Sequence, residues 1–518
     1  MTRIATLLLL LWMVPAHADP ASRGVPPTPK FDAPLITAVY SVALRFMEPR
    51  TLEAVPVPQL TLWGLRGLTA LDPDLTTDQL EGKLRLIAAG RVVFSEAPPD
   101  QPTPALWAAA AVRLSGSAVT VSAAVRDAGS QGVIQSFFDE LFNHLDPYSR
   151  YVGPLRAMAD RANRNGSAGL GLVLERRDNT VRVKAAVQDG PAALAGIQPG
   201  DTLVSVDATP VRGDAERAAA LIAGPLDSTV ELTWRGRNGR RHSAELTRAK
   251  VPPESVYSQR LDKILLLRVT GFNDTTAEHL TRALQDGMAA ADPPDGIVLD
   301  LRDNRGGLLR EAVEAADELL PAGIVAYTIG RDPDANHVWR SQSGQLARDV
   351  PLVVLVDGRT ASAAEVLAAA LADRGRAVVV GSATLGKGLV QTIKPLPDGG
   401  ELFVTWSRVI APRGWPLQGL GVLPQVCTSL GGEALRRQLD ELARGVQPMA
   451  ADIETQRAAR APLPPAAMVA IRRTCPAAGG NEDDMAAARV LIDNPAAYAA
   501  ALLPPLIEAA GQAASAAR

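Results

Sequence analysis

The spacing of apolar residues along the chain divides residues 31–518 into four parts. From 31 to 152 apolar side chains recur every three or four positions, as in LITAVYSVALRFM and VIQSFFDELFNHL, which predicts a helical region. From 167 to 250 the period is two, as in LGLVLE and VRVKAAV, and turn residues separate the apolar runs. This alternation predicts a compact β-rich domain of about 85 residues.

The third part, 251–426, alternates short apolar strands with longer amphipathic helices. Strands such as ILLLRV and GIVLDLR are each followed by a helical stretch, a pattern that predicts right-handed βαβ units and a largely parallel sheet. The last part, 427–518, is rich in alanine, with helical segments near 430–445 and 482–512. The expected fold class is therefore an α/β core with an inserted β-rich domain and helical N- and C-terminal regions.

The first thirty residues have the pattern of an export signal and a linker. Arg3 precedes an apolar run from Ile4 to Val14, and Ala-His-Ala then provides a small-x-small cleavage pattern ending at Ala18. The apolar run is only about half of the ~20 residues that a membrane-spanning helix needs. We therefore predict a signal peptide over 1–18, a Pro-rich linker over 19–30, and an exported protein, with the bacterial periplasm as the expected location.

Charge and histidine content exclude several functions. The 53 basic and 56 acidic residues give a formal net charge of −3, which offers no basis for binding nucleic acid or an acidic membrane surface. The five histidines are scattered, without a His-x-x-x-His pair, and no Gly-x-Ser-x-Gly motif is present. These absences argue against a zinc peptidase and an α/β-hydrolase, and no metal or cofactor is expected.

Ser362 lies where an apolar strand, LVVLV, hands over to an Ala-rich helix. Two roles are open to a serine at this place. It can cap the helix, because Ser362 and Glu365 form a Ser-x-x-Glu capping box that stabilises a helix start by about 1 kcal/mol. It can also attack a carbonyl, because the free N–H groups of a helix start stabilise negative charge. Local sequence alone favours the cap.

Lys387 changes this balance. It lies in the glycine-flanked turn TLGKG, between two apolar strands. A lysine serves as general base for a serine when burial lowers its pKa towards neutrality, and the amide of Gln391 could hold it without keeping it protonated. Upstream, Gly306 and Gly307 in LDLRDNRGG follow a buried strand and open a helix. Their N–H groups could approach an oxyanion, although the pair could also be a simple tight turn.

Five motifs together, in the same order, are similar to those of the carboxy-terminal processing peptidases, also called tail-specific proteases. The motifs are LDPYSRY, GPAALAGIQPGDTLVSVD, LDLRDNRGG, TASAAE and LGKGLVQ, and the resemblance covers about residues 31 to 426. It implies a crotonase- or ClpP-like α/β core, 251–426, with an inserted PDZ domain, 167–250, that engages the C-terminus of a substrate. It also implies a serine endopeptidase with a Ser–Lys dyad.

The resemblance assigns roles residue by residue. Ser362 corresponds to the nucleophile, Lys387 to the general base and Gln391 to the residue that orients it. The oxyanion hole of the family corresponds to Ala363 and Gly307, and its supporting positions correspond to Glu365 and Asp373. Its carboxylate-binding loop corresponds to Gly169, Leu170, Gly171 and Leu172. The chain departs from the family pattern at Arg305, where proline is usual, and at Ala364, where serine is usual.

Three functions are compatible with these features. The first is an exported serine endopeptidase that cleaves proteins with apolar C-termini. The second is a non-catalytic PDZ scaffold on a decayed peptidase core, which retention of Ser362, Lys387 and Gln391 disfavours. The third, an acyl-CoA enzyme on a similar core, is disfavoured because an exported protein has little access to CoA esters. The helical terminal regions could build a homo-oligomer or bind an adaptor.

The two cysteines, Cys427 and Cys475, fit an exported protein with a single disulfide, although two free buried thiols would also satisfy the sequence. A disulfide between them would tether the C-terminal region to the core.

Overall fold

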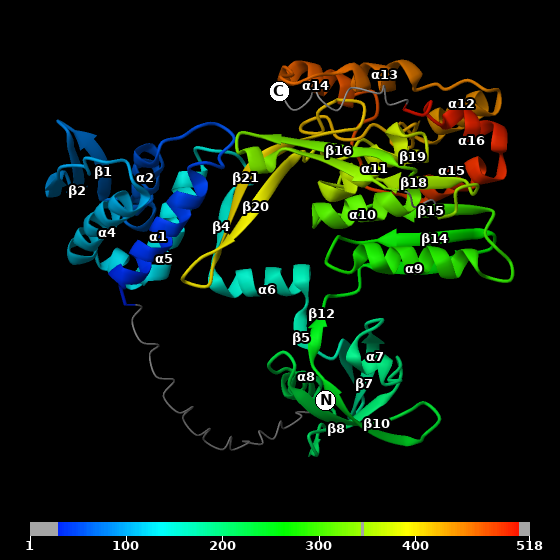
Figure 1. The fold of residues 1–518 in the computed structure, drawn as a ribbon, viewed down its shortest axis with the longest axis horizontal. Helices are drawn as coiled ribbons and strands as arrows, with labels where there is room; N and C mark the ends of the chain where they lie inside the picture. The colour runs from blue at the N-terminus through cyan, green and yellow to red at the C-terminus, as the bar shows by residue number, and fades with distance from the viewer. Residues whose placement is uncertain (1–29, 343–345, 507–518) are drawn as a thin grey trace, which may run out of the picture.

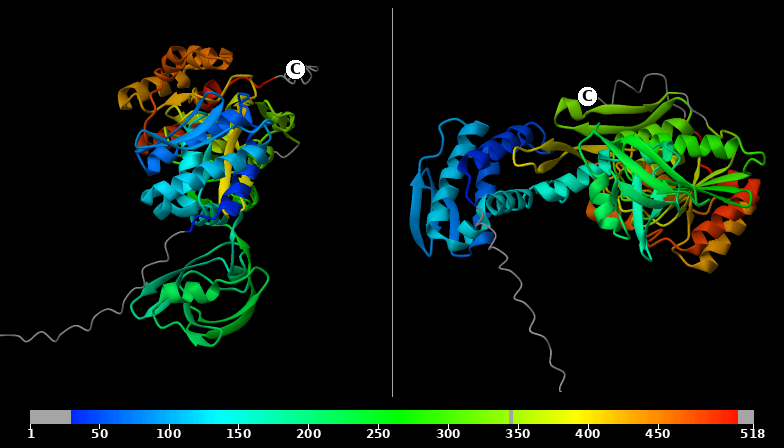
Figure 2. Two further views of the ribbon diagram at one scale, coloured as in Figure 1. Left: turned by 90° about the vertical axis from the view of Figure 1, so that its left-hand side faces the viewer. Right: turned by 90° about the horizontal axis from the view of Figure 1, so that it is seen from below.

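The structure is a computed structural model and describes residues 30–342 and 346–506. The predicted signal peptide, 1–18, and all but the last residue of the predicted linker, 19–30, lie outside the described residues. Figures 1 and 2 show three groups of elements: a mainly helical N-terminal region, a core of helices and strands, and a β-rich domain that is connected to the core. In the described part of the chain no helix is both long and apolar enough to cross a membrane.

The N-terminal region is built from five helices around an aromatic-rich core, in which Tyr40 stacks on Phe137 at 4.0 Å between ring centroids. The helices are α1 (Ala33–Met47), α2 (Val57–Leu65), α3 (Leu68–Leu71), α4 (Pro104–Val121) and α5 (Ala123–Phe142).

This region also contains a three-stranded antiparallel sheet, which the helical pattern did not predict. Its strands are β1 (Leu75–Leu80), β2 (Lys83–Ala88) and β3 (Arg91–Glu96). Two tight turns connect these strands, and both central residues of each turn have positive φ. The φ angles are 51° at Glu81 and 70° at Gly82 in the first turn, and 48° at Ala89 and 77° at Gly90 in the second. Such turns match the twist of a hairpin, but Glu-Gly and Ala-Gly are weaker turn signals than Asn-Gly.

The β-rich domain is a five-strand antiparallel path in the order β11-β10-β8-β7-β6, with β9 paired to β8. Its elements are β6 (Leu172–Arg177), β7 (Thr180–Ala186), α7 (Pro191–Leu194), β8 (Thr202–Val206), β9 (Thr209–Pro210), α8 (Ala215–Ile222), β10 (Thr229–Arg235) and β11 (Arg241–Thr247). A short antiparallel pair, β5 (Ser167–Gly169) with β12 (Ala249–Val251), joins the domain to the rest of the chain. The alternating pattern therefore predicted the strands correctly.

The core has a main sheet in the order β13-β14-β15-β18-β19-β22, in which every neighbouring pair except β13 and β14 is parallel. The strands are β13 (Val256–Leu261), β14 (Ile264–Val269), β15 (Gly296–Asp300), β18 (Leu352–Val356), β19 (Val378–Gly381) and β22 (Val426–Cys427). Helices α9 (Thr276–Met288), α10 (Leu309–Leu319) and α11 (Ala363–Asp373) connect them. The largely parallel sheet expected from the βαβ pattern is thus present.

Helices cover both faces of this sheet, because its strands are apolar on both sides. Leu265 and Val354 pack with α9, α10 and α11, whereas Ile264 and Val353 pack with helices of the C-terminal region. That region comprises α12 (Gly432–Ala443), α13 (Ala450–Ala458), α14 (Pro465–Arg472), α15 (Glu482–Asp493) and α16 (Pro495–Ala501). Cys427 and Cys475, both fully buried, are joined by a disulfide, so the C-terminal region is bonded to the end of β22.

A second sheet connects the core to the N-terminal region. It contains β17 (His337–Ser341), β16 (Gly323–Gly330), β21 (Glu401–Ile410) and β20 (Leu389–Pro395), with β4 (Arg150–Val152) on the other side of β21. One end of β21 packs in the N-terminal cluster through Leu402, and the other packs in the core through Val409. Helix α6 (Pro154–Asn165) follows β4 and leads into the β-rich domain.

Candidate active site

Ser362 lies at the start of α11, after the turn that leaves β18. Its backbone has φ 57° and ψ −121°, a conformation that non-glycine residues rarely adopt. Such strain costs about 1–3 kcal/mol and tends to occur at functional sites. The predicted capping box is also present, and its Glu365 carboxylate accepts a hydrogen bond from Ser362 N–H at 2.7 Å. The cap and the strained turn therefore exist together.

Glu365 joins the serine turn to the lysine turn. Its side chain is fully buried, and it accepts hydrogen bonds from Gly386 N–H at 2.6 Å, from Lys387 N–H at 2.9 Å and from the Thr384 hydroxyl. Burial raises the pKa of Glu365, and these donors oppose the rise. One carboxylate thus holds the two segments, which are about twenty residues apart in sequence, against each other.

Lys387 and Ser362 line the same hollow, of about 500 Å³. The Lys387 ammonium nitrogen lies 5.1 Å from the centre of the Tyr148 ring. The pKa of Lys387 is lowered, first because burial disfavours the charged form and second because Arg150 is nearby, while Glu365 and Asp146 oppose the shift. A lysine with a lowered pKa is the form that a general base requires.

Gln391 lines this hollow as well, but its side chain forms hydrogen bonds with residues other than Lys387. Its amide donates to Leu389 C=O at 3.0 Å and to the Thr405 hydroxyl at 3.1 Å, and Thr405 donates to Asp146 at 2.6 Å. Val390 pairs with Ser407 and Gln391 with Thr405, so the register between β20 and β21 shifts at this point and Trp406 of β21 is left without a partner in β20. Within the described residues no hydrogen bond joins Gln391 to Lys387, so the expected orienting contact is not formed in this state.

Two free N–H groups lie beside Ser362. The backbone of Gly306 lies so close to the start of α11 that a Cβ added to Gly306 would be 2.8 Å from Ser362 Cβ and 3.0 Å from Ala363 N. Gly306 N–H donates to the Asn304 side chain at 2.8 Å, whereas Gly307 N–H and Ala363 N–H have no partner among the residues described. This difference favours Gly307 over Gly306 as the second oxyanion donor, a choice that sequence left uncertain.

The loop Gly169-Leu170-Gly171-Leu172 lies between β5 and β6 and borders a groove of about 320 Å³ that α8 lines on its other side. Leu170 C=O and Gly171 C=O accept hydrogen bonds from within the domain, at 3.0 and 2.7 Å. The N–H groups of these two residues have no partner in the described part of the chain. Free N–H groups beside an open strand can bind a peptide end.

Comparison with known proteins identifies the two folded units. The family model for peptidase family S41 matches residues 263–428, and a PDZ-domain model matches residues 182–236. The carboxy-terminal-processing protease of Bartonella bacilliformis is 32% identical over 302 residues, which are 57% of this chain and 69% of that protein. The chain belongs to the carboxy-terminal processing protease family.

A second sequence relative agrees with this assignment. The carboxy-terminal processing protease CtpA of Bacillus subtilis is 31% identical over 317 residues, 61% of this chain and 66% of that protein. Among solved structures, a photosystem II D1 C-terminal processing protease is 30% identical, covering 58% of this chain and 86% of its own, with a TM-score of 0.34. The two family models and the sequence relatives show that this carboxy-terminal processing protease carries a serine-type peptidase domain and a peptide-binding PDZ domain, and the family and fold class predicted from sequence are confirmed.

Asp373 is placed far from the hollow of this protease. It is eight residues beyond Glu365 on α11, about 12 Å along the helix axis. It accepts hydrogen bonds from Trp415 Nε1 at 2.7 Å and from Arg457 Nε at 2.9 Å. Asp373, predicted as a supporting residue, thus lies at a distance from Ser362 and joins α13 to the core through Arg457.

Several residues that support the site in this protease were not found from sequence. Asp146 and Tyr148 belong to the LDPYS motif, but nothing local indicated that they approach Lys387. Arg472 on α14 donates to Leu420 C=O at 2.7 Å, and an added Cβ on Gly386 would lie 3.4 Å from its guanidinium. These contacts join segments far apart in the chain, so no local pattern could reveal them.

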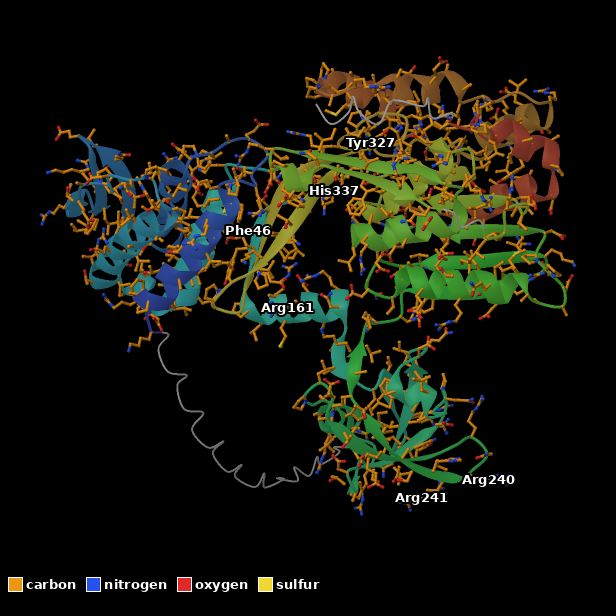
Figure 3. The ribbon with its side chains drawn as sticks, in the orientation of Figure 1. Phe46, Arg161, Arg240, Arg241, Tyr327 and His337 are labelled. Carbon is orange, nitrogen blue, oxygen red and sulfur yellow. A yellow bond between two sulfur atoms is a disulfide. The ribbon has the colours of Figure 1, made fainter. Side chains whose placement is uncertain are left out.

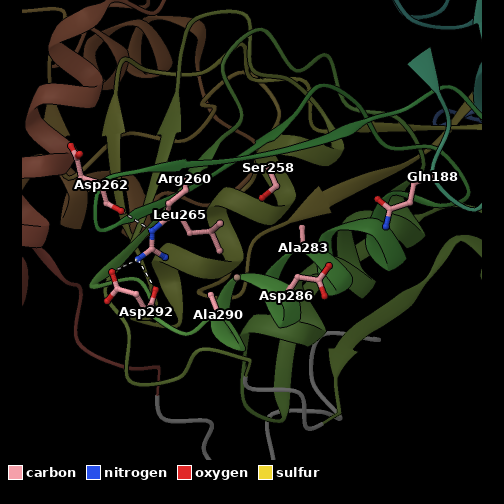
Figure 4. A pocket seen from close by; sticks show the side chains of 10 residues that line it. Gln188, Ser258, Arg260, Asp262, Leu265, Ala283, Asp286, Ala290 and Asp292 are labelled. Carbon is pink, nitrogen blue, oxygen red and sulfur yellow. Dashed lines mark hydrogen bonds and ion pairs between the residues drawn. The ribbon is translucent and has the colours of Figure 1, made fainter. Parts of the chain in front are cut away.

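A second hollow of about 500 Å³ lies between β13 and α9 and is drawn in Figure 4. It contains none of the residues predicted for catalysis or peptide binding. Its Arg260 donates to the backbone of Asp292 and Pro293, at 2.9 and 3.1 Å. Among the residues that the structure describes, no cluster of three or more histidine, cysteine or acidic side chains could hold a metal ion.

Proposed function

We propose that this chain is an exported serine endopeptidase that cleaves proteins in a C-terminus-dependent manner through a Ser362–Lys387 dyad. The observation that carries the proposal is the Glu365 carboxylate, which accepts from Ser362 N–H and Lys387 N–H and so holds nucleophile and base in one hollow. The lowered pKa of Lys387 and the strained backbone of Ser362 support the same assignment.

The proposed reaction uses only groups of this chain. Neutral Lys387 takes the proton of the Ser362 hydroxyl as its oxygen attacks the scissile carbonyl carbon. The developing oxyanion accepts hydrogen bonds from Ala363 N–H and Gly307 N–H, which have no other partner in the described residues. The Lys387 ammonium then protonates the leaving amine. Lys387 next activates the water that hydrolyses the acyl-enzyme, and Gln391 orients the lysine once substrate displaces its present contacts.

The PDZ domain supplies the dependence on the substrate's C-terminus. The free N–H groups of Leu170 and Gly171 would bind the terminal carboxylate, and the groove between β6 and α8 would take apolar side chains of the tail. Export rests on the predicted signal peptide, 1–18, and on the Cys427–Cys475 disulfide, which suits an oxidising compartment such as the periplasm. The helical terminal regions remain candidates for forming a homo-oligomer or binding an adaptor.

The test compares the cleavage of two versions of one unfolded protein, whose last three residues are apolar in one version and charged in the other. We expect Ser362→Ala and Lys387→Ala each to lower the cleavage rate by at least about 10³-fold, because the two side chains act as one unit. Lys394→Ala is the matched control, since Lys394 lies exposed on the same strand, β20. Full activity in either dyad variant would refute the proposal. Tail binding without cleavage by the wild type would instead indicate a non-catalytic scaffold.

A further inference from the structure

The hollow around Ser362 has an unbalanced set of charges. Four arginines line it, from β4, from α6 and from the glycine turn before α10, together with Lys387. The arginines are Arg150, Arg156, Arg164 and Arg305. The only carboxylate among the described lining residues is Asp160. A cleft lined by one sign of charge attracts ligands of the opposite sign.

Some of this positive charge is already neutralised within the molecule. Arg164 pairs at 2.7 Å with Glu401, a buried carboxylate that Arg161 shares at 3.1 Å. Arg305 lies 3.4 Å from Asp303, but its side chain is 62% exposed. An ion pair this exposed stabilises weakly, so Arg305 can exchange Asp303 for a carboxylate of a ligand at little cost.

Two of the arginines have no such partner. In the part of the chain that the structure describes, no carboxylate lies within ion-pair distance of Arg150 or Arg156. Arg150 stacks over the ring of Phe403 at 4.0 Å and donates to Tyr148 C=O at 3.0 Å, which leaves most of its charge uncompensated. The pKa of Arg150 is lowered, mainly by burial, and the positive charges of Arg156 and Arg164 add to this while Asp160 opposes it. The arginines therefore repel one another.

Helix α6 places this charge on the path between tail binding and cleavage. Asn163, near its end, lines both the Ser362 hollow and the PDZ groove. The 12 residues of α6 span about 18 Å, which is the length of about five residues of extended chain. Figure 3 shows Arg161 on this helix, between the N-terminal region and the core. A substrate whose tail lies in the groove would pass these arginines before it reaches Ser362.

We propose that this hollow selects substrates with acidic side chains within about five residues of the scissile bond, and that Arg156 and Arg305 determine this preference. The inference rests on the proposed function, because it assumes that the hollow holds the scissile bond. Apolar residues at the tail and acidic residues next to the cut would then be recognised by two separate sites, the PDZ groove and the arginine-lined hollow.

The experiment uses three peptides that share length and an apolar last three residues. Their central five positions carry glutamate, glutamine or lysine at the same two places. For the wild type we expect kcat/KM to be highest for the glutamate peptide and lowest for the lysine peptide, about tenfold apart, since each exposed pair contributes only modestly. Between 0.1 M and 1 M salt the screening length falls from about 10 Å to about 3 Å, so the ratio should shrink.

The double variant Arg156→Glu/Arg305→Glu should invert this order. The matched control is Arg240→Glu/Arg241→Glu, which makes the same change in net charge at the far end of the PDZ domain (Figure 3) and should preserve the wild-type order. Circular dichroism melting checks that both variants are folded, and the ratio between peptides does not depend on the amount of active enzyme.

The outcomes separate the two proposals. Equal rates for the three peptides in the wild type, or inversion by the control variant as well, would overturn the acidic preference. In that case cleavage that still disappears in Ser362→Ala leaves the proposed function intact. Cleavage that persists in Ser362→Ala would instead refute the proposed function itself.

Discussion

Helix α11 carries a buried carboxylate near each end, and the two have opposite surroundings. Glu365 and Asp373 are both fully buried. Glu365 accepts hydrogen bonds from three backbone N–H groups and one hydroxyl, and no cationic group of the described residues lies within ion-pair distance of it. Asp373 pairs with the buried guanidinium of Arg457 at 2.9 Å.

The difference shows what each carboxylate holds in place. Backbone N–H donors fix the main chain itself, so Glu365 sets the relative position of the turns that carry Ser362 and Lys387. A guanidinium lies at the end of a long side chain, so Asp373 attaches α13 without setting any catalytic geometry. Burial alone therefore does not distinguish the two carboxylates, whereas the segments that each one joins do.

Asp373→Asn should have the largest effect, and the effect should be on stability. The substitution leaves the buried Arg457 without a counter-ion, which lowers the free energy of unfolding by about 3–5 kcal/mol. Urea unfolding measures this loss, and cleavage at a temperature where the variant is folded should stay within about threefold of wild type. Normal stability with a large loss of kcat would show that Asp373 belongs to the active site after all.

Glu365→Gln should show the reverse pattern. The glutamine amide has an NH₂ donor where the carboxylate has its second acceptor oxygen. One of the N–H groups that the Glu365 carboxylate binds would therefore face another donor. Displacement of the nucleophile or base by about 1 Å lowers kcat/KM by about 100-fold. The control is Glu314→Gln, an exposed position on α10. Wild-type kcat/KM in Glu365→Gln would mean that the two turns keep their positions without this carboxylate.

The smallest effect concerns pH. In the proposed dyad cleavage requires neutral Lys387, so kcat/KM should rise with pH through a lysine pKa that lies below the usual 10.5. Arg150→Gln removes a nearby positive charge, which raises the pKa of Lys387 and moves this rise to higher pH. A pH profile of kcat/KM measures the shift, and movement to lower pH would contradict the assigned cause.

The same lowered pKa has a consequence for stability. Between the folded-state pKa of Lys387 and 10.5, the unfolded chain binds more protons than the folded one. As pH rises through that window, the free energy of unfolding therefore increases, because the folded state no longer has to bury a charged Lys387.

Much of the site could be predicted because its parts are local. The strand-to-helix position of Ser362, the capping box with Glu365 and the glycine turn at Lys387 are short patterns with direct physical meaning. The distant position of Asp373 could also have been predicted, because eight residues of helix span about 12 Å. What sequence could not provide was the link between turns, since nothing local shows that Glu365 binds Gly386.

The parts that were missed depend on contacts between distant segments or on weak turn signals. Arg472 reaches the lysine turn from a helix that begins at Pro465, and Thr405 contacts Asp146 across 259 positions. The apolar spacing over 31–152 predicts helices and not the β1–β3 sheet, whose turns contain Glu-Gly and Ala-Gly, weaker signals than Asn-Gly.

Labelling with a fluorophosphonate tests the activation of Ser362 by Lys387 most directly. Intact-mass analysis and peptide mapping should find one adduct, on Ser362, in the wild type. Lys387→Ala should lower the labelling rate by at least about 100-fold, because general-base assistance is lost. Labelling of Ser362 at the wild-type rate in Lys387→Ala, or of a different serine in the wild type, would contradict the Ser362–Lys387 dyad.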